Sequence, residues 1–329
     1  MSDKTISLSD IEAAENLLGI EYSQGERELM VDNLEDLIAS AQARRNVIFP
    51  NALPPATTFD PRLPTTRLPA AQKPISTSKV EAGALPENDV DIAYSPVTQL
   101  SEWIRSGQIT SRRLVEIYID RIKTLGPTLE CVVTVLEELA LEQADDADRM
   151  IANGQYLGPL HGIPYGMKDL FDTKNIRTTW GAVPYKDRIA KKDARIVTLL
   201  REAGAVLVAK TTLGALAYGD IWFGGVTRNP WNIAEGASGS SAGSASATAA
   251  GLVGFSIGTE TLGSITSPSQ RCGTTGLRPT FGRVSRSGAM ALCWSLDKIG
   301  PICRTVEDTV LVLSAINGFD SDDKGSLDA

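Results

Sequence analysis

The sequence predicts an α/β fold, and three observations support the prediction. A helical pattern that begins with Asp193 as its cap ends at Gly204, and the apolar run AVLVAK at 205–210 follows it as a strand buried on both faces. Two more short apolar runs, at 165–171 and 252–257, alternate with glycine-rich turns. Helices that alternate with short apolar strands are typical of α/β domains.

The first 49 residues are predicted to form an acidic helical extension. Two capping boxes, Ser9 with Glu12 and Ser23 with Glu26, mark the starts of two helices. Ten acidic and four basic residues place a charge of −6 on this segment, out of −8 for the whole chain. The remainder of the chain is therefore nearly neutral.

The next segment, 50–94, is predicted to be an extended linker or strap. Nine of the seventeen prolines lie between Pro50 and Pro96, with little apolar periodicity. We expect one α/β core over 95–329. Its expected helices start near Thr98, start at Thr110 or Ser111, span 136–152 and span 306–317.

Composition excludes several functions. The chain has 32 basic and 40 acidic residues without a basic run, which disfavours direct binding to nucleic acid or to an anionic membrane. Its single histidine, His161, excludes a multi-histidine zinc site and is expected to be a packed structural residue. We expect neither a metal nor a cofactor.

The four cysteines show no CxxC spacing and are expected to be buried, reduced residues. The N-terminus lacks the pattern of a secretory signal, and no stretch of about 18 apolar residues occurs. These features predict a cytoplasmic protein.

Two serine-bearing turns flank one predicted helix and strand. The first is GASGSSAGSASATAAGL at 236–252, and the second is GTETLGSI at 258–265. A flexible linker would not run directly into an alanine-rich helix and an apolar strand, so the arrangement favours a site. The accidental GxSxG at 239–243 does not predict a hydrolase triad, because no histidine follows it.

A serine enzyme without a suitable histidine needs another base, and Lys168 is the candidate. It lies in GIPYGMKDLFD at 162–172, on an apolar, strand-like segment, where a lysine must be paired, shifted in pKa or functional. Lowering a lysine pKa from about 10.4 to about 7 costs roughly 4 to 5 kcal/mol. The structural alternative is an ion pair with Asp169.

Together these motifs resemble the amidase signature family. The resemblance covers roughly residues 95–320 and also includes CGTTGLRPTFGRVS, SLDKIGP and RTVED. The separations of 72 residues from Lys168 to Ser240 and 24 from Ser240 to Ser264 are similar to the family's. The resemblance to this family implies a mixed β-sheet covered by helices on both faces.

The resemblance also implies a Ser-Ser-Lys mechanism. Ser264 would be the nucleophile, Ser240 a bridging serine on a cis peptide after Gly239, and Lys168 the base that ends the relay. An acyl-enzyme would form. Backbone N–H groups would face the oxyanion, from Thr261, Leu262, Gly263 and Ser264.

The sequence departs from the family pattern in three places. Leu262 replaces a glycine, which would be strained if its φ were positive. Thr266 replaces an arginine, which removes an expected partner of Glu260. We also expect the chain to be incomplete at its C-terminus, with an uncovered sheet edge.

The leading interpretation is an amidase that hydrolyses a linear carboxamide, with a small-molecule substrate and a possible homo-oligomer. A second is the glutaminase subunit of a tRNA-dependent amidotransferase, which SLDKIGPICRTVED also resembles. A third is an inactive, incomplete chain that serves only as a binding or assembly partner.

Overall fold

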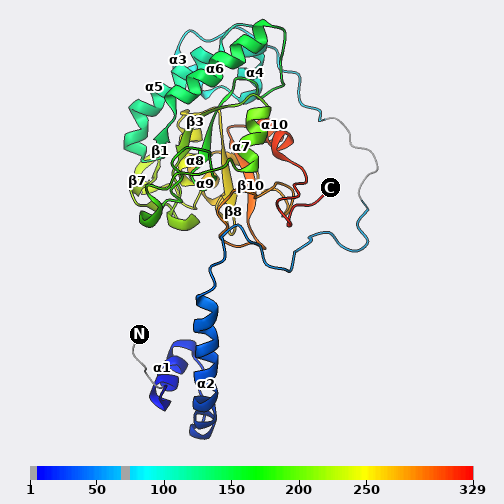
Figure 1. Cartoon of the computed structure of the whole chain (residues 1–329). Coiled ribbons are helices and arrows are strands. Elements are labelled where there is room, and N and C mark those ends of the chain that lie inside the picture. The colour runs from blue at the N-terminus through cyan, green and yellow to red at the C-terminus, as the bar shows by residue number, and fades with distance from the viewer. Residues whose placement is uncertain (1–5, 68–74, 329) are drawn as a thin grey trace. The chain divides into compact units, whose positions relative to one another are not determined.

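The computed structural model describes residues 6–67 and 75–328. The chain divides into two compact units, 1–53 and 54–329, which are described separately. Figure 1 shows the elements of both units with their labels.

The first unit contains two helices, α1 (Leu8–Leu18) and α2 (Gln24–Arg45). The Ser23 capping box of α2 is confirmed. The prediction that Ser9 caps α1 is wrong, because Ser7 has the extended backbone of a cap and exchanges hydrogen bonds with Asp10.

The second unit is built on a mixed six-stranded sheet, as predicted. Strand β2 runs parallel to both of its neighbours, β3 and β8, and the other pairs are antiparallel. The strand order is β1 (Val132–Val135), β3 (Val206–Thr211), β2 (Pro164–Lys168), β8 (Phe255–Glu260), β10 (Lys298–Cys303) and β9 (Thr275–Gly276).

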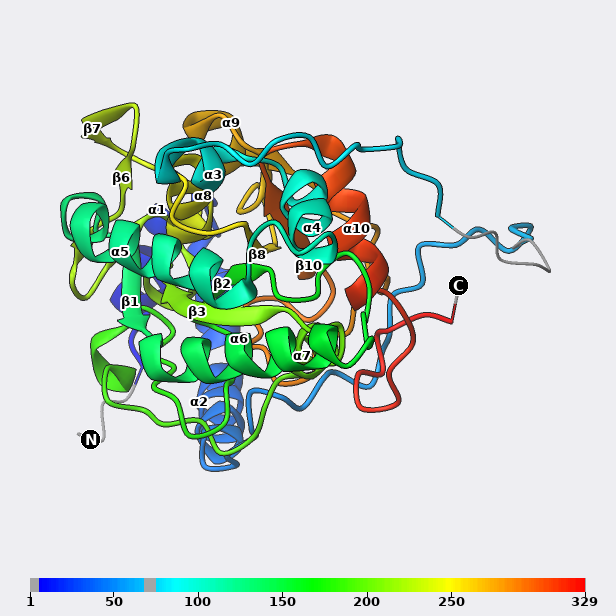
Figure 2. The same cartoon turned by 90° about the horizontal axis from the view of Figure 1, so that it is seen from above.

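Helices cover both faces of this sheet. In Figure 2, α5 lies on one side of β3, and α6 and α7 lie on the other. The helices are α3 (Asp89–Tyr94), α4 (Val97–Arg105), α5 (Ser111–Leu129), α6 (Glu137–Ala152), α7 (Arg195–Glu202), α8 (Ala242–Ala249), α9 (Thr266–Cys272) and α10 (Val306–Ile316). Two small hairpins, β4–β5 (Ile221–Trp222, Gly225–Val226) and β6–β7 (Arg228–Asn229, Asn232–Gly236), precede α8.

Two predicted helix starts are displaced. Helix α7 begins after Ala194, and Asp193 does not cap it because its carboxylate accepts the Lys174 N–H and binds Arg201. Helix α4 begins one residue before Thr98, whereas Thr110 caps α5 as expected.

No helix or strand forms in 54–67 or 75–88, but α3 falls within the range expected to be a strap. The ring of Phe59 packs edge-on against Phe281, with 5.6 Å between centroids. The Ser78 N–H donates to Glu307 at 2.8 Å. These contacts hold the extended chain on the surface of the second unit.

The alternation along β2 determines where the site lies. Tyr165 and Met167 point into an apolar core that also receives side chains from α4, α5, α7 and α10. Gly166 and Lys168 point to the opposite face, where α8 packs. All eight residues of α8 are buried, and its small side chains let it lie close to the sheet.

Candidate active site

Lys168 brings a buried amine to the end of β2. Its side chain is fully buried, and its Nζ lies 2.8 Å from Ser240 Oγ, 2.9 Å from Ser241 Oγ and 2.8 Å from Thr259 Oγ1. These three partners are hydroxyls, and the Thr259 carbonyl oxygen lies 3.4 Å from Nζ. Ser240 and Ser241 begin the segment that becomes α8, and Thr259 lies near the end of β8.

Burial lowers the pKa of Lys168 well below its ordinary value. The charges of Asp297 and Glu260 act in the opposite direction, but they do not restore the pKa. A neutral amine has a lone pair that can accept a proton from a hydroxyl. The surroundings of Lys168 therefore favour the protonation state that a base requires.

The structural alternative, an ion pair between Lys168 and Asp169, is wrong. Adjacent strand residues point to opposite faces, and Asp169 instead pairs with Lys210 of β3, with 3.4 Å between Oδ1 and Nζ. The other carboxylate oxygen of Asp169 accepts the N–H and the hydroxyl of Thr179. The neighbouring acid thus pairs with Lys210 and Thr179, not with Lys168.

A left-handed turn, not a cis peptide, precedes Ser240. The described residues contain no cis peptide bond, so the predicted cis bond after Gly239 is wrong for this structure. Two consecutive residues with positive φ reverse the chain instead, Ser238 at 67° and Gly239 at 57°. A Cβ on Gly239 would lie 2.5 Å from Pro268 Cδ, so only glycine fits here.

The second serine-bearing turn connects β8 to α9. Its left-handed position falls on Gly263, with φ of 83°. The φ of Leu262 is not positive, so the condition for strain at Leu262 is not met. Leu262 is 82% exposed, and Ser264 is half-buried. The Ser264 carbonyl accepts the Ser241 N–H at 3.1 Å, which joins the two turns.

The structure brings the predicted residues together in part. Lys168 and Ser240 are hydrogen-bonded through their side chains, and the backbone of Ser264 is bonded to the next residue, Ser241. Within the described ranges, the hydroxyl of Ser264 makes no side-chain hydrogen bond.

Glu260 stabilises the start of α9 and has partners that the sequence did not indicate. Its buried carboxylate accepts the Ile265 and Thr266 N–H groups at 2.9 Å and the Thr266 hydroxyl at 3.0 Å. Arg278 lies 3.4 Å away. Burial raises the pKa of Glu260, but the hydrogen bonds outweigh it and the pKa is lowered. Thr266 and Arg278 thus replace the missing arginine.

Asp297, which the sequence motifs did not single out, contacts the second serine-bearing turn. It accepts the Thr261 hydroxyl at 2.5 Å and the N–H groups of Leu292 and Cys293. The Lys298 amine donates to the Thr261 carbonyl at 3.1 Å. Asp297 belongs to the SLDKIGP motif, so this motif could have indicated Asp297 as a residue of the site.

His161 is structural, as expected. It is 1% exposed, its Nδ1 accepts the Leu157 N–H, and its Nε2 lies 3.0 Å from the Ala147 carbonyl. Over 6–67 and 75–328, no group of three or more His, Cys, Asp or Glu side chains could hold a metal ion. Of the helices in these ranges, none is both long and apolar enough to cross a membrane.

Comparisons with known proteins show which family the chain is similar to. A family model described as Amidase matches residues 113–329. The A component of the glutamyl-tRNA(Gln) amidotransferase of Coxiella burnetii (strain Dugway 5J108-111) is 43% identical over 235 residues, which are 70% of this chain and 48% of that protein. The chain spans about half the length of the curated relatives it matches.

Two solved amidase structures are also similar to this chain. A native peptide amidase from Stenotrophomonas maltophilia is 38% identical, with a TM-score of 0.67 over 70% of this chain and 50% of its own. A bacterial aryl acylamidase described as an amidase signature enzyme is 32% identical, with a TM-score of 0.66 over 72% of this chain and 50% of its own.

Proposed function

Because the chain belongs to the amidase signature family, we propose that it hydrolyses the C–N bond of a linear carboxamide through Lys168, Ser240 and Ser264. The observation that carries the proposal is the fully buried Lys168 amine, whose pKa is lowered and whose Nζ lies 2.8 Å from Ser240 Oγ. This arrangement is a base in contact with a hydroxyl, in a chain whose one imidazole is structural.

In the attack step two coupled proton transfers move one net proton from Ser264 to Lys168 by way of Ser240. Ser264 Oγ attacks the amide carbon while its proton passes to Ser240 Oγ, and the Ser240 proton passes to the neutral Lys168 amine. When the tetrahedral intermediate collapses, the proton returns through Ser240 to the leaving nitrogen, and the C–N bond breaks. Water then attacks the acyl-enzyme by the same relay, which releases a carboxylic acid and restores the Ser264 hydroxyl.

Backbone N–H groups of the nucleophile turn would stabilise the oxyanion. Among the described residues, the N–H groups of Thr261, Leu262 and Ser264 donate to no other protein group. The Gly263 N–H contributes to lowering the pKa of Glu260, so it is already directed to a carboxylate. We propose Thr261 and Leu262 as the main donors, with Gly263 in a shared role.

Active-site labelling tests this proposal. The full chain and its Ser264→Ala variant are incubated with a fluorophosphonate, and intact masses are measured. We expect one adduct on the parent and none on Ser264→Ala, while a matched Ser106→Ala variant, changed at an exposed site on the end of α4, labels like the parent. A folded parent without an adduct would favour the inactive, incomplete chain.

The second candidate is the glutaminase subunit of a tRNA-dependent amidotransferase. The curated relatives named as the A component of glutamyl-tRNA(Gln) amidotransferases, at 40–45% identity, favour it. It predicts that glutamine is the preferred amide and that a partner protein stimulates release of ammonia. Comparing ammonia release from glutamine with that from a panel of simple carboxamides separates the two candidates.

A further inference from the structure

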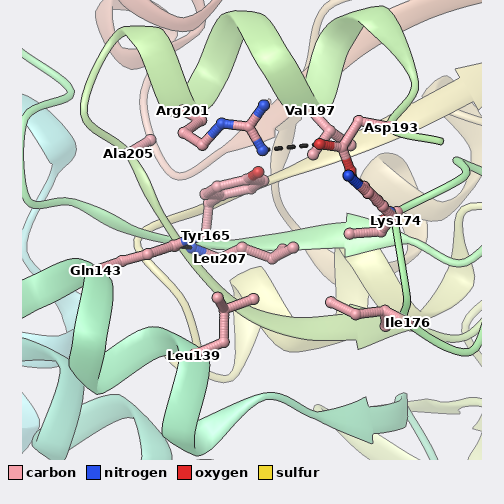
Figure 3. A pocket seen from close by; sticks show the side chains of 11 residues that line it. Leu139, Gln143, Tyr165, Lys174, Ile176, Asp193, Val197, Arg201, Ala205 and Leu207 are labelled. Atoms are coloured by element: carbon pink, nitrogen blue, oxygen red, sulfur yellow. Dashed lines mark hydrogen bonds and ion pairs between the residues drawn. The ribbon is translucent and has the colours of Figure 1, made fainter.

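One pocket lies away from the serines and Lys168. It has a cavity volume of about 170 Å³ and opens between α6 and α7, over β2 and β3 (Figure 3). Apolar side chains form most of its wall, from Leu139, Ile176, Val197, Ala205 and Leu207. An apolar cavity of about 150 Å³ is large enough to hold benzene, so a single aromatic ring fits this space.

The pocket and the candidate active site occupy opposite faces of β2. Tyr165 contributes its ring to the pocket, and Lys168 points to the face covered by α8. A molecule in this pocket would therefore not touch Ser240 or Ser264.

The hydroxyl of Tyr165 is an unused donor at the pocket. Tyr165 is 1% exposed, and in the part of the chain that the structure describes its hydroxyl has no hydrogen-bond partner. Figure 3 shows the hydroxyl pointing toward the ion pair between Arg201 and Asp193. Burial raises the pKa of Tyr165, so the phenol stays protonated and able to donate. The hydroxyl is not fully shielded from solvent, so a ligand in the pocket can accept a hydrogen bond from it.

The charges at the mouth favour an anion. Lys174 and Arg201 line the pocket with Asp193 as the one acid. Both oxygens of Asp193 are already used, by the Lys174 N–H and by the Arg201 guanidinium, each at 2.7 Å. The charged residues that line the pocket are therefore two bases and one acid whose oxygens already accept hydrogen bonds.

We propose that this pocket binds a small carboxylate with a single aromatic ring. The ring would lie against the apolar wall, and the carboxylate would accept hydrogen bonds from the Tyr165 hydroxyl and the Arg201 guanidinium. Lys174 would add favourable charge at the mouth. The proposal is independent of the amidase function, because it uses none of the residues assigned to that reaction.

The test is titration of 4-fluorobenzoate with the full chain, followed by fluorine NMR. We expect saturable binding that weakens as salt is raised. Arg201→Gln should weaken binding about tenfold through loss of a charge-assisted hydrogen bond, and Tyr165→Phe about threefold. Leu139→Trp, on a half-buried residue of α6, should fill the cavity and abolish binding.

Matched controls make the result decisive. Arg149→Gln removes an exposed arginine of α6 outside the pocket and should bind like the parent. The neutral probe 4-fluorobenzyl alcohol should bind at least about tenfold more weakly than the carboxylate. Arg201 is half exposed, so Arg201→Gln should stay folded even if Leu139→Trp does not. Circular dichroism of both variants would show whether each is folded. Equal binding of both probes, no binding by the parent, or unchanged binding by Arg201→Gln would each overturn the proposal.

Discussion

Replacing Lys168 with methionine should change how the stability of the second unit depends on pH. Because burial lowers the folded-state pKa of Lys168, the unfolded chain binds more protons than the folded chain between that pKa and about 10.4. Stability contributed by this group is therefore lost as pH falls through the window and regained as pH rises. The slope is about 1.4 kcal/mol per pH unit, or about 2.7 kcal/mol over two units.

Urea unfolding followed by tryptophan fluorescence measures this effect. All five tryptophans lie between Trp103 and Trp294, so the signal reports on the second unit alone. In the window, the free energy of unfolding of Lys168→Met should rise less steeply with pH than that of the parent, by about 1.4 kcal/mol per unit. The matched control is Lys123→Met, at an exposed lysine of α5, which should leave the parent slope unchanged. Parallel curves for the parent and Lys168→Met would refute a lowered pKa at Lys168.

Three further predictions concern the same region. Lys168→Ala should slow fluorophosphonate labelling of the chain by about 10² to 10⁴-fold near neutral pH, with partial recovery as pH rises, and equal labelling rates from about pH 6 to 9 would remove lysine from the mechanism. Gly239→Ala should destabilise the second unit by about 2 to 4 kcal/mol in urea, since the residue has positive φ and its Cβ would meet Pro268; an unchanged midpoint would contradict the turn geometry. Asp169→Asn should cost about 3 kcal/mol by leaving buried Lys210 without its carboxylate, and a loss as small as that of an exposed Asp→Asn variant would show that the pair contributes little.

Periodicity in the sequence was enough to predict the main helices and strands of the second unit. The buried runs became β2, β3 and β8, and Thr110 caps α5, because strand burial and local capping depend on nearby residues. Asp193 shows where that reasoning fails. Its carboxylate accepts a hydrogen bond from the Lys174 N–H, 19 residues away in the sequence. That contact exists only in the folded chain.

The sequence was enough to predict several residues of the site, but not the contacts between them. The apolar setting of Lys168 indicated an amine that is paired, shifted in pKa or functional. Its partners Ser241 and Thr259 were not selected, because they come from separate elements that only the sheet brings together. Strand alternation could have excluded the pair with Asp169 in advance. The left-handed turn at Gly239 could not be told from a cis bond by composition.

The hydrogen bond from the Ser241 amide to the Ser264 carbonyl gives the site an internal reporter. Ser241 is the residue before α8, a helix with no exposed residue, so its amide is expected to exchange slowly with solvent deuterium. We expect a covalent group on the Ser264 hydroxyl to disturb the backbone carbonyl of the same residue, which accepts this bond. Acylation of Ser264 should therefore be measurable as faster deuterium uptake at Ser241, the residue before α8.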